Sequence, residues 1–341
     1  MPSARPQATV VVVTYNGAHL LPDCLDALAK QTLPSDQFEV WVVDNGSIDA
    51  TGELVAGKYP WAQLLRASEN LGFAGGNNLA LRLATTPFAV VVNNDARPEP
   101  DFLERVLAPF AEPGADRVAA VTAKVHLDER REGHDVINST GNLIARSGWG
   151  FDRDFLRVDD GAPADREVFG FCGCAAALRM SALREVDFFD DDLFLYFEDT
   201  DLSWRLRATG WEIWHEPTAV ARHLYAASSD PGSPFSTYQQ GRNMLLVFTR
   251  HAPVRVAAWV AVRFLLSIPW HAVREAPNLR LTIARLKAVG GFVRRLPRAL
   301  VDRRRIWRDA PVPRDVVARF IVTAPPRPRV TPIASPSNSR Q

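Results

Sequence analysis

Short valine-rich runs alternate with helical patterns over the first 125 residues of this 341-residue chain. The clearest runs are 8–13, 38–43 and 87–92, with weaker candidates at 61–67 and 117–125. Continuous apolar runs are typical of strands buried on both faces, as in parallel sheets. Helical patterns separate them, beginning near Leu21 and spanning 49–58, 74–84 and 100–110. We therefore predict an α/β fold, with a mostly parallel sheet flanked by helices and right-handed crossovers.

The composition, 47% hydrophobic and 23% charged, excludes a disordered, collagen-like or coiled-coil protein. The net charge of +1 hides an asymmetry, because residues 241–341 hold 20 Lys and Arg against four Asp and Glu. This excess predicts a basic part that faces an anionic surface or the acidic body. We expect three segments: an α/β domain over 1–230, a basic amphipathic helical extension over 231–310, and a flexible Pro/Ser-rich tail over 311–341.

Three cysteines, Cys24, Cys172 and Cys174, are too few for a disulfide framework or a four-ligand zinc site. The sequence starts without a secretory pattern. The most apolar stretch, 256–273, is interrupted by Arg263 and Pro269, so a membrane-spanning helix is not expected. These features predict a cytoplasmic protein.

Polar residues follow the predicted strands, where ligands bind in parallel sheets. Thr14-Tyr15-Asn16-Gly17 follows the first strand and Asp44-Asn45-Gly46-Ser47 the second. The Asp44 carboxylate can accept the ring N–H of uracil, thymine or guanine, although the same residues also suit a turn. Residues 70–78 form a Gly/Asn-rich loop suited to ribose or phosphate, but not a dinucleotide fingerprint.

Two further groups carry acids. Asn93-Asn94-Asp95 ends a strand and suits a divalent cation on a diphosphate, provided that a second protein ligand exists; the alternative is a plain loop. Glu198-Asp199 stands at a predicted helix start, where a carboxylate can serve as general base or only as a solvated cap. His223 lies 24 residues beyond Asp199, and a lone histidine is more often structural.

Taken in order, these blocks resemble the family 2 glycosyltransferases, inverting enzymes with a GT-A fold, in the branch that includes rhamnosyl- and galactofuranosyltransferases. The similar text is VVVVTYNGAHLLPDCLDAL, VWVVDNGSIDAT, ENLGFAGGNN, VVNNDARPEPDFL and FDDDLFLYFEDTDLSWRLRATG, followed by His223. It covers residues 8–225.

The resemblance implies a role for each matching residue. Those expected to bind the donor are Thr14, Tyr15, Asn16, Asp44, Asn45, Ser47, Asn70, Gly75, Asn78 and Asn94. Asp95 and His223 are the implied metal ligands, with Asn93 a weak one because it stands where many relatives have Asp. Asp199 is the implied general base, and Glu198 orients the base or the acceptor. Gly173 and Trp204 are assigned to the acceptor.

The resemblance also implies a mechanism and partners. Mg²⁺ or Mn²⁺ assists departure of the nucleoside diphosphate while Asp199 activates an acceptor hydroxyl, with inversion. The best-matching donor is dTDP-rhamnose, with a UDP-sugar such as UDP-galactofuranose as the alternative. The acceptor is a saccharide or a lipid-linked saccharide, in cell-wall or polysaccharide synthesis. The basic segment 241–308 contacts a membrane, a partner subunit or its own domain. Nucleic acid is not expected, and a homo-oligomer remains open. Two rival functions are disfavoured: a degenerate binding module, because Glu198, Asp199, Asp95 and His223 are all retained, and a dinucleotide oxidoreductase, because Tyr15-Asn16-Gly17 follows the first strand.

Overall fold

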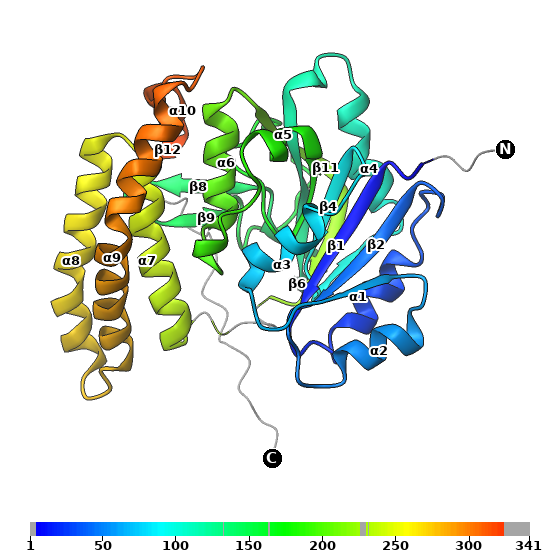
Figure 1. Cartoon of the computed structure of the whole chain (residues 1–341), viewed down its shortest axis with the longest axis horizontal. Helices are drawn as coiled ribbons and strands as arrows, with labels where there is room; N and C mark the ends of the chain where they lie inside the picture. The colour runs from blue at the N-terminus through cyan, green and yellow to red at the C-terminus, as the bar shows by residue number, and fades with distance from the viewer. Residues whose placement is uncertain (1–4, 132, 163, 226–229, 231, 324–341) are drawn as a thin grey trace.

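The computed structural model describes residues 5–131, 133–162, 164–225, 230 and 232–323 (Figure 1). Its main sheet has nine strands in the order β3-β2-β1-β4-β10-β6-β11-β5, with β7 paired to β6. The strands are β1 (Ala8–Thr14), β2 (Phe38–Asp44), β3 (Gln63–Arg66), β4 (Phe88–Val92), β5 (Ala96–Pro98), β6 (Val118–Arg131), β7 (His134–Ser139), β10 (Ala175–Arg179) and β11 (Glu212–His223). β1 is parallel to β2 and β4, and β2 to β3, whereas β10 runs antiparallel between β4 and β6. The predicted mostly parallel α/β sheet is confirmed.

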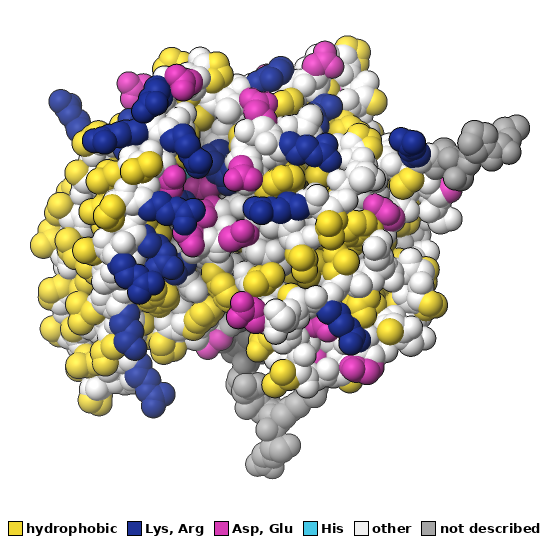
Figure 2. All heavy atoms as spheres, in the orientation of Figure 1, with side chains coloured by type: hydrophobic (Ala, Val, Ile, Leu, Met, Phe, Trp, Pro, Cys, Tyr) yellow, Lys and Arg dark blue, Asp and Glu magenta, His cyan; other side chains and the backbone are white. Residues whose placement is uncertain are grey.

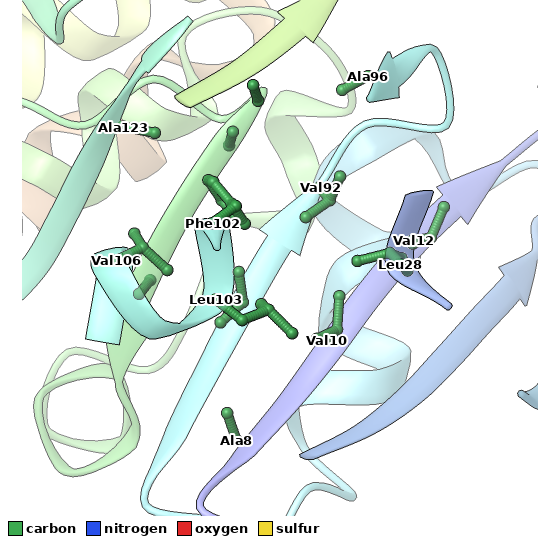
Figure 3. Close-up of a cluster of buried hydrophobic side chains, with 14 of the residues drawn as sticks. Ala8, Val10, Val12, Leu28, Val92, Ala96, Phe102, Leu103, Val106 and Ala123 are labelled. Atoms are coloured by element: carbon green, nitrogen blue, oxygen red, sulfur yellow. The ribbon is translucent and has the colours of Figure 1, made fainter. Parts of the chain in front are cut away.

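Helices cover both faces of the main sheet. One face packs on α1 (Leu21–Leu28), α2 (Thr51–Lys58) and α4 (Phe102–Leu107), and the other on α3 (Gly72–Leu81), α5 (Met180–Glu185) and α6 (Glu198–Ala208). Strand alternation divides β1 between the two cores, because Val10 and Val12 join the first and Val11 the second. Figure 3 shows Val10 and Val92 on the side of Phe102 and Leu103 of α4, with Val12 beside Leu28 of α1.

The helical extension is packed on the sheet domain. It comprises α7 (Pro234–His251), α8 (Val254–Glu275) and α9 (Arg280–Arg308), and its core includes Trp204 of α6. Pro269 does not break α8. It has no N–H to donate to the carbonyl of Leu265 one turn earlier, but this face of the helix is exposed, so water can donate to that carbonyl instead.

A small second sheet ties the end of the described chain to this body. It contains β8 (Asn142–Ala145), β9 (Gly150–Asp152) and β12 (Ile321–Val322), with β12 parallel to β8. Part of the segment expected to be flexible, 311–323, therefore contains α10 (Arg314–Val317) and β12. Residues 324–341 of that expected tail lie outside the described residues.

A buried ion cluster joins α6 to the extension. Asp201 accepts from Arg205 Nε at 2.8 Å and contacts His251 Nε2 at 2.7 Å, with Arg250 Nη1 at 3.5 Å. Burial raises the pKa of Asp201, but the charges of Arg205, His251 and Arg250 outweigh it and hold that pKa below its usual value. Asp201 thus contributes stability above the unfolded-state pKa of about 3.9, and this contribution is lost as the pH falls.

We expect Asp201→Asn to lower the free energy of unfolding by about 3 kcal/mol, because it leaves buried cations without their carboxylate. The matched control is Asp101→Asn, which removes an i,i+4 contact to Arg105 of similar length but on the surface, and should cost less than about 1 kcal/mol. Urea denaturation at pH 7 measures both changes. Equal losses in the two variants would contradict a stabilising role for the buried cluster.

Candidate functional site

A cavity of about 880 Å³ lies where β1 and β4 end, at the junction between the sheet domain and the extension. It brings together most of the residues that the sequence singled out. Those lining it are Thr14, Tyr15, Asn45, Asn70, Asn93, Asn94, Asp95, Gly173, Glu198, Asp199 and His223. They come from seven segments of the sequence, and their meeting gives one shared site.

The loops after β1, β2 and β4 are held together by amide side chains. Asn94 Nδ2 donates to Thr14 Oγ1 at 2.9 Å, and Asn45 Nδ2 donates to the carbonyl of Gly72 at 2.9 Å. Gly72 has φ +72°, and a Cβ there would lie 2.3 Å from the carbonyl oxygen of Phe194. This position therefore requires glycine, and it seats the Gly/Asn-rich loop against the segment that precedes α6.

Asp44, Asn16 and Ser47 are not among the residues that line the cavity. Asp44 accepts the Ser47 backbone N–H at 3.0 Å, and Ser47 Oγ accepts the Asn16 N–H at 2.9 Å. These are the turn contacts that the sequence left open as an alternative. Contact of Asp44 with a base stays a prediction.

Asp95 and His223 meet at the other end of the site. His223 Nε2 lies 3.1 Å from Asp95 Oδ1, and His223 Nδ1 lies 2.6 Å from Asn138 Oδ1. An Asn oxygen can only accept, so Nδ1 carries the proton and, in a neutral ring, Nε2 directs its lone pair at the carboxylate. A cation bound by both Nε2 and the carboxylate, or a second proton on the ring, would remove the repulsion between these two acceptors. The pair is therefore suited to bind a metal ion. No cluster of three His, Cys, Asp or Glu suited to a metal occurs among the described residues.

Glu198 and Asp199 are the first two residues of α6. Asp199 Oδ2 accepts from Asn142 Nδ2 at 2.6 Å and from the Gly173 N–H at 3.3 Å. Burial raises the pKa of Asp199, which these hydrogen bonds partly oppose. Burial, with the charge of Asp199, raises the pKa of Glu198 well above its ordinary value. Two such carboxyls differ in proton affinity from solvated acids, as general acid–base chemistry requires.

The structure corrects three assignments. Trp204 is fully buried in the helical core, edge-on to Phe169 and Phe248, because five residues turn a helix by about 140° from Asp199. It cannot contact an acceptor. Asn78 is buried and donates to Phe189 O and Asp191 Oδ1, so it holds a loop. Gly75 faces Leu71, where a Cβ would lie 2.8 Å from the Leu71 Cβ, and is not among the cavity-lining residues.

Sequence reasoning missed several residues of the site. Asn138, Asn142 and Asp152 all line the cavity but come from a stretch with no clear periodicity. Burial raises the pKa of Asp152 to about 6, opposed by a hydrogen bond from Ser139 and reinforced by the charge of Asp199. A lone Asp and two Asn in an irregular segment give no signal of their own.

Asn243 of α7 was also missed, although it shapes the approach to α6. Its Nδ2 donates to the carbonyls of Leu193, Leu195 and Tyr196 at 2.7, 2.9 and 2.7 Å. The extension therefore fixes the backbone that delivers the two carboxylates.

Known proteins of similar sequence or fold transfer sugars. The family model described as Glycosyl transferase family 2 matches residues 9–187. The N-acetylglucosaminyl-diphospho-decaprenol L-rhamnosyltransferase of Mycobacterium tuberculosis is 28% identical over 312 residues, covering 83% of this chain and 97% of the relative. Glycosyltransferase AglE of Haloferax volcanii is 31% identical over 121 residues, covering 35% of this chain and 40% of the relative. A mannosyltransferase from Pyrobaculum calidifontis, solved with GDP-Man and Mn²⁺, has a TM-score of 0.53 at 21% identity, covering 86% of this chain and 88% of that one, a likeness of fold.

The raised pKa of Glu198 means that folding disfavours its ionised form, so this residue destabilises the fold at neutral pH and not in acid. We expect Glu198→Gln to raise the melting temperature at pH 7 by about 2–4 °C, the shift for roughly 1 kcal/mol. At about pH 4, where the unfolded-state group begins to protonate, the gain should vanish. The control is Glu53→Gln, an exposed acid also in a first helical turn. Calorimetry of both variants measures this, and a lower melting temperature for Glu198→Gln would contradict it.

Proposed function

We propose that this chain, which belongs to glycosyl transferase family 2, moves a sugar from a nucleotide-sugar donor to an acceptor hydroxyl by a metal-assisted single displacement with inversion. Membership of the family establishes a GT-A glycosyltransferase that uses a nucleotide sugar. The observation that carries the finer mechanism is the convergence of Asp199, Asp95 and His223 on one cavity.

The charge of the cavity supports a bound cation. Its described lining contains no Lys or Arg but five acidic residues: Asp95, Asp152, Glu198, Asp199 and Asp230. A nucleoside diphosphate would add negative charge to this acidic site, and a bound cation would offset the resulting repulsion. Asp95 and His223 would hold Mg²⁺ or Mn²⁺, with phosphate oxygens completing the shell. When bound, the ion neutralises the charge that develops on the departing diphosphate.

Asp199 is placed to act as the base. Its Oδ2 is oriented by Asn142 and by the Gly173 N–H, and a carboxylate of raised pKa is a better proton acceptor than a solvated one. The proton leaves the acceptor hydroxyl as its oxygen attacks the anomeric carbon from the face opposite the leaving diphosphate. One displacement inverts the configuration, and no covalent enzyme intermediate is needed.

For the donor, we propose dTDP-rhamnose. A relative matched over 83% of this chain is named an L-rhamnosyltransferase, which supports this sugar over others. UDP-sugars, galactofuranose among them, are the alternative. Turnover of dTDP-rhamnose, UDP-galactofuranose and GDP-mannose, each with Mn²⁺ or with chelator, distinguishes the candidates and tests the metal. Nucleotide binding without turnover of any donor would instead indicate a degenerate binding module.

We expect Asp199→Asn to lower kcat/KM by about 10²–10⁴-fold, because the amide cannot take the acceptor proton. Wild-type activity should fall on the acid side at a pH above the ordinary Asp pKa of about 3.9, since burial raises the pKa of the base. Asp187→Asn, on an exposed acid near the same helix, is the control and should keep full activity. Initial rates of sugar transfer across pH measure both effects. Equal turnover of wild type and Asp199→Asn would rule out this base.

We also propose that the extension rests on an anionic membrane surface, from which a lipid-linked acceptor reaches the site. α8 is long and apolar enough to span a membrane by length and composition, and only 17% of its most apolar window is buried. Val260, Phe264 and Ile268 pack inward, whereas Trp259, Leu266, Trp270 and Val273 are exposed along the opposite face. A helix with one face packed on its own protein suits an interfacial position.

Basic side chains flank this apolar face. Figure 2 shows hydrophobic side chains over α8 at the left edge and a column of Lys and Arg beside them along α9. The exposed cations of α9 include Lys287, Arg294, Arg298 and Arg305. Insertion of the apolar face would bring these charges to the headgroup level, where each contributes about 1 kcal/mol with anionic lipid. This complementarity favours a membrane over a second copy of the chain, whose own cations would repel.

We expect Leu266→Asp to weaken binding to phosphatidylglycerol vesicles by at least about tenfold, because the buried apolar area is lost and a charge is added. Leu83→Asp, which changes a similarly exposed leucine on the sheet domain, should bind like wild type. Vesicle sedimentation, with phosphatidylcholine vesicles for comparison, measures this. A dimer by light scattering that Leu266→Asp dissociates, or equal binding of both variants, would contradict membrane docking.

A further inference from the structure

The β8–β9 hairpin forms a wall of the cavity, and the mechanism above uses only Asn142 of it, which orients Asp199. Trp149, Gly150, Phe151 and Asp152 all line the cavity. The backbone packs against the start of α6, since a Cβ at Gly150 would lie 3.6 Å from both Phe197 Cε1 and Thr200 Oγ1. This wall therefore borders the position of the reacting hydroxyl.

The strand register places Asp152 next to the base. Asn142 and Asp152 are directly opposite in the antiparallel β8–β9 pair. Opposite residues project to the same side of such a pair, with Cβ atoms about 4.5–5.5 Å apart. Asn142 Nδ2 is the group that donates to Asp199 Oδ2 at 2.6 Å. Asp152 thus presents a second acceptor group within one residue pair of the catalytic carboxylate.

Glu198 gives an independent sign that a ligand belongs here. Its side chain is 94% buried and lines the cavity, yet Oε2 has no hydrogen-bond partner within the part of the chain that the structure describes. A buried acceptor without a partner is costly, and a hydroxyl donor from a bound molecule would satisfy it. Aromatic walls with a few placed polar groups are the usual composition of a small-molecule site.

The turn at the rim of this wall packs against α8. Arg263 Nη1 donates to the Ser147 carbonyl at 3.1 Å, and a Cβ at Gly148 would lie 2.6 Å from Val260 Cγ1. Trp149, the next residue, is half-exposed and lines the cavity. The hairpin thus runs from its contacts with α8 at Ser147 and Gly148 into the cavity lining at Trp149 and Asp152.

We propose that the β8–β9 hairpin is the acceptor subsite and fixes acceptor specificity. Asp152 and Glu198 accept hydrogen bonds from hydroxyls of the acceptor sugar adjacent to the attacked one, and Trp149 covers an apolar face of the sugar or of the lipid diphosphate stem. The ligand class is a prenyl-diphosphate-linked saccharide. This inference rests on the proposed function, and it adds the residues that select the acceptor.

The test measures transfer from dTDP-rhamnose to N-acetylglucosaminyl diphosphate carrying a short prenyl chain, with donor and acceptor varied separately. We expect Asp152→Asn to raise the acceptor KM about tenfold or more, while the donor KM and the slow hydrolysis of donor without acceptor stay unchanged. Trp149→Ala should raise the acceptor KM as well, which keeps the test open if one variant is unstable. The controls are Asp160→Asn, an exposed acid, and Trp61→Ala, whose side chain is as exposed as that of Trp149 (45% against 43%).

An unchanged acceptor KM in both subsite variants, or an equal loss of donor affinity, would overturn the proposal. A wild-type enzyme that hydrolyses the donor but never modifies this probe would overturn the acceptor class. Absence of any reaction with every nucleotide sugar would instead contradict the proposed function, so the two failures are distinguishable.

Discussion

Helix α6 is the element on which both halves of the molecule depend, because three of its sides are buried against different partners. Leu202 and Leu206 pack into the sheet core, and Trp204 packs into the helical core. Asp201 contacts Arg250 and His251 of α7, and the first turn delivers Glu198 and Asp199 to the cavity. The extension is therefore part of the catalytic unit. Its removal would expose Trp204 and leave a buried carboxylate without most of its partners.

The segment before α6 is held in an uncommon backbone conformation. Phe194, Tyr196 and Phe197 have φ values of 63°, 68° and 70°, which cost about 1–3 kcal/mol each for side chains of this size. Asn243 offsets this cost by donating to three carbonyls of the segment, and Arg242 donates to Leu193 O at 3.1 Å. Helix α7 thereby selects the conformation that aims two carboxylates into the cavity.

The strands and their polar ends could be predicted because local periodicity and strand chemistry determine them. The runs at 8–13, 38–43 and 87–92 correspond to β1, β2 and β4, and the residues after β1 and β4 line the cavity. The hairpin that holds Asn142 and Asp152 has no such period, and its register depends on tertiary packing. Trp204 was assigned to the acceptor from the resemblance, but helical geometry places it on a different face of α6 from Asp199. Asn243 could not be predicted, because the hydrophobic pattern of its helix indicates only which face is apolar and not what a buried polar side chain contacts.

The geometry links the cavity to the surface of the extension through one short turn. Residues 147–149 contact α8 on one side and the cavity on the other, so a displacement of α8 must be transmitted to Trp149 or absorbed by the Arg263–Ser147 contact. Densely packed elements transmit such shifts rather than absorbing them, because interiors hold few voids. If α8 rests in lipid, the same contact fixes the height of the cavity rim above the membrane. An acceptor sugar on a diphosphate stem would then reach Asp199 while its lipid chain stays in the bilayer. The length of stem that the enzyme tolerates would be set by this hairpin.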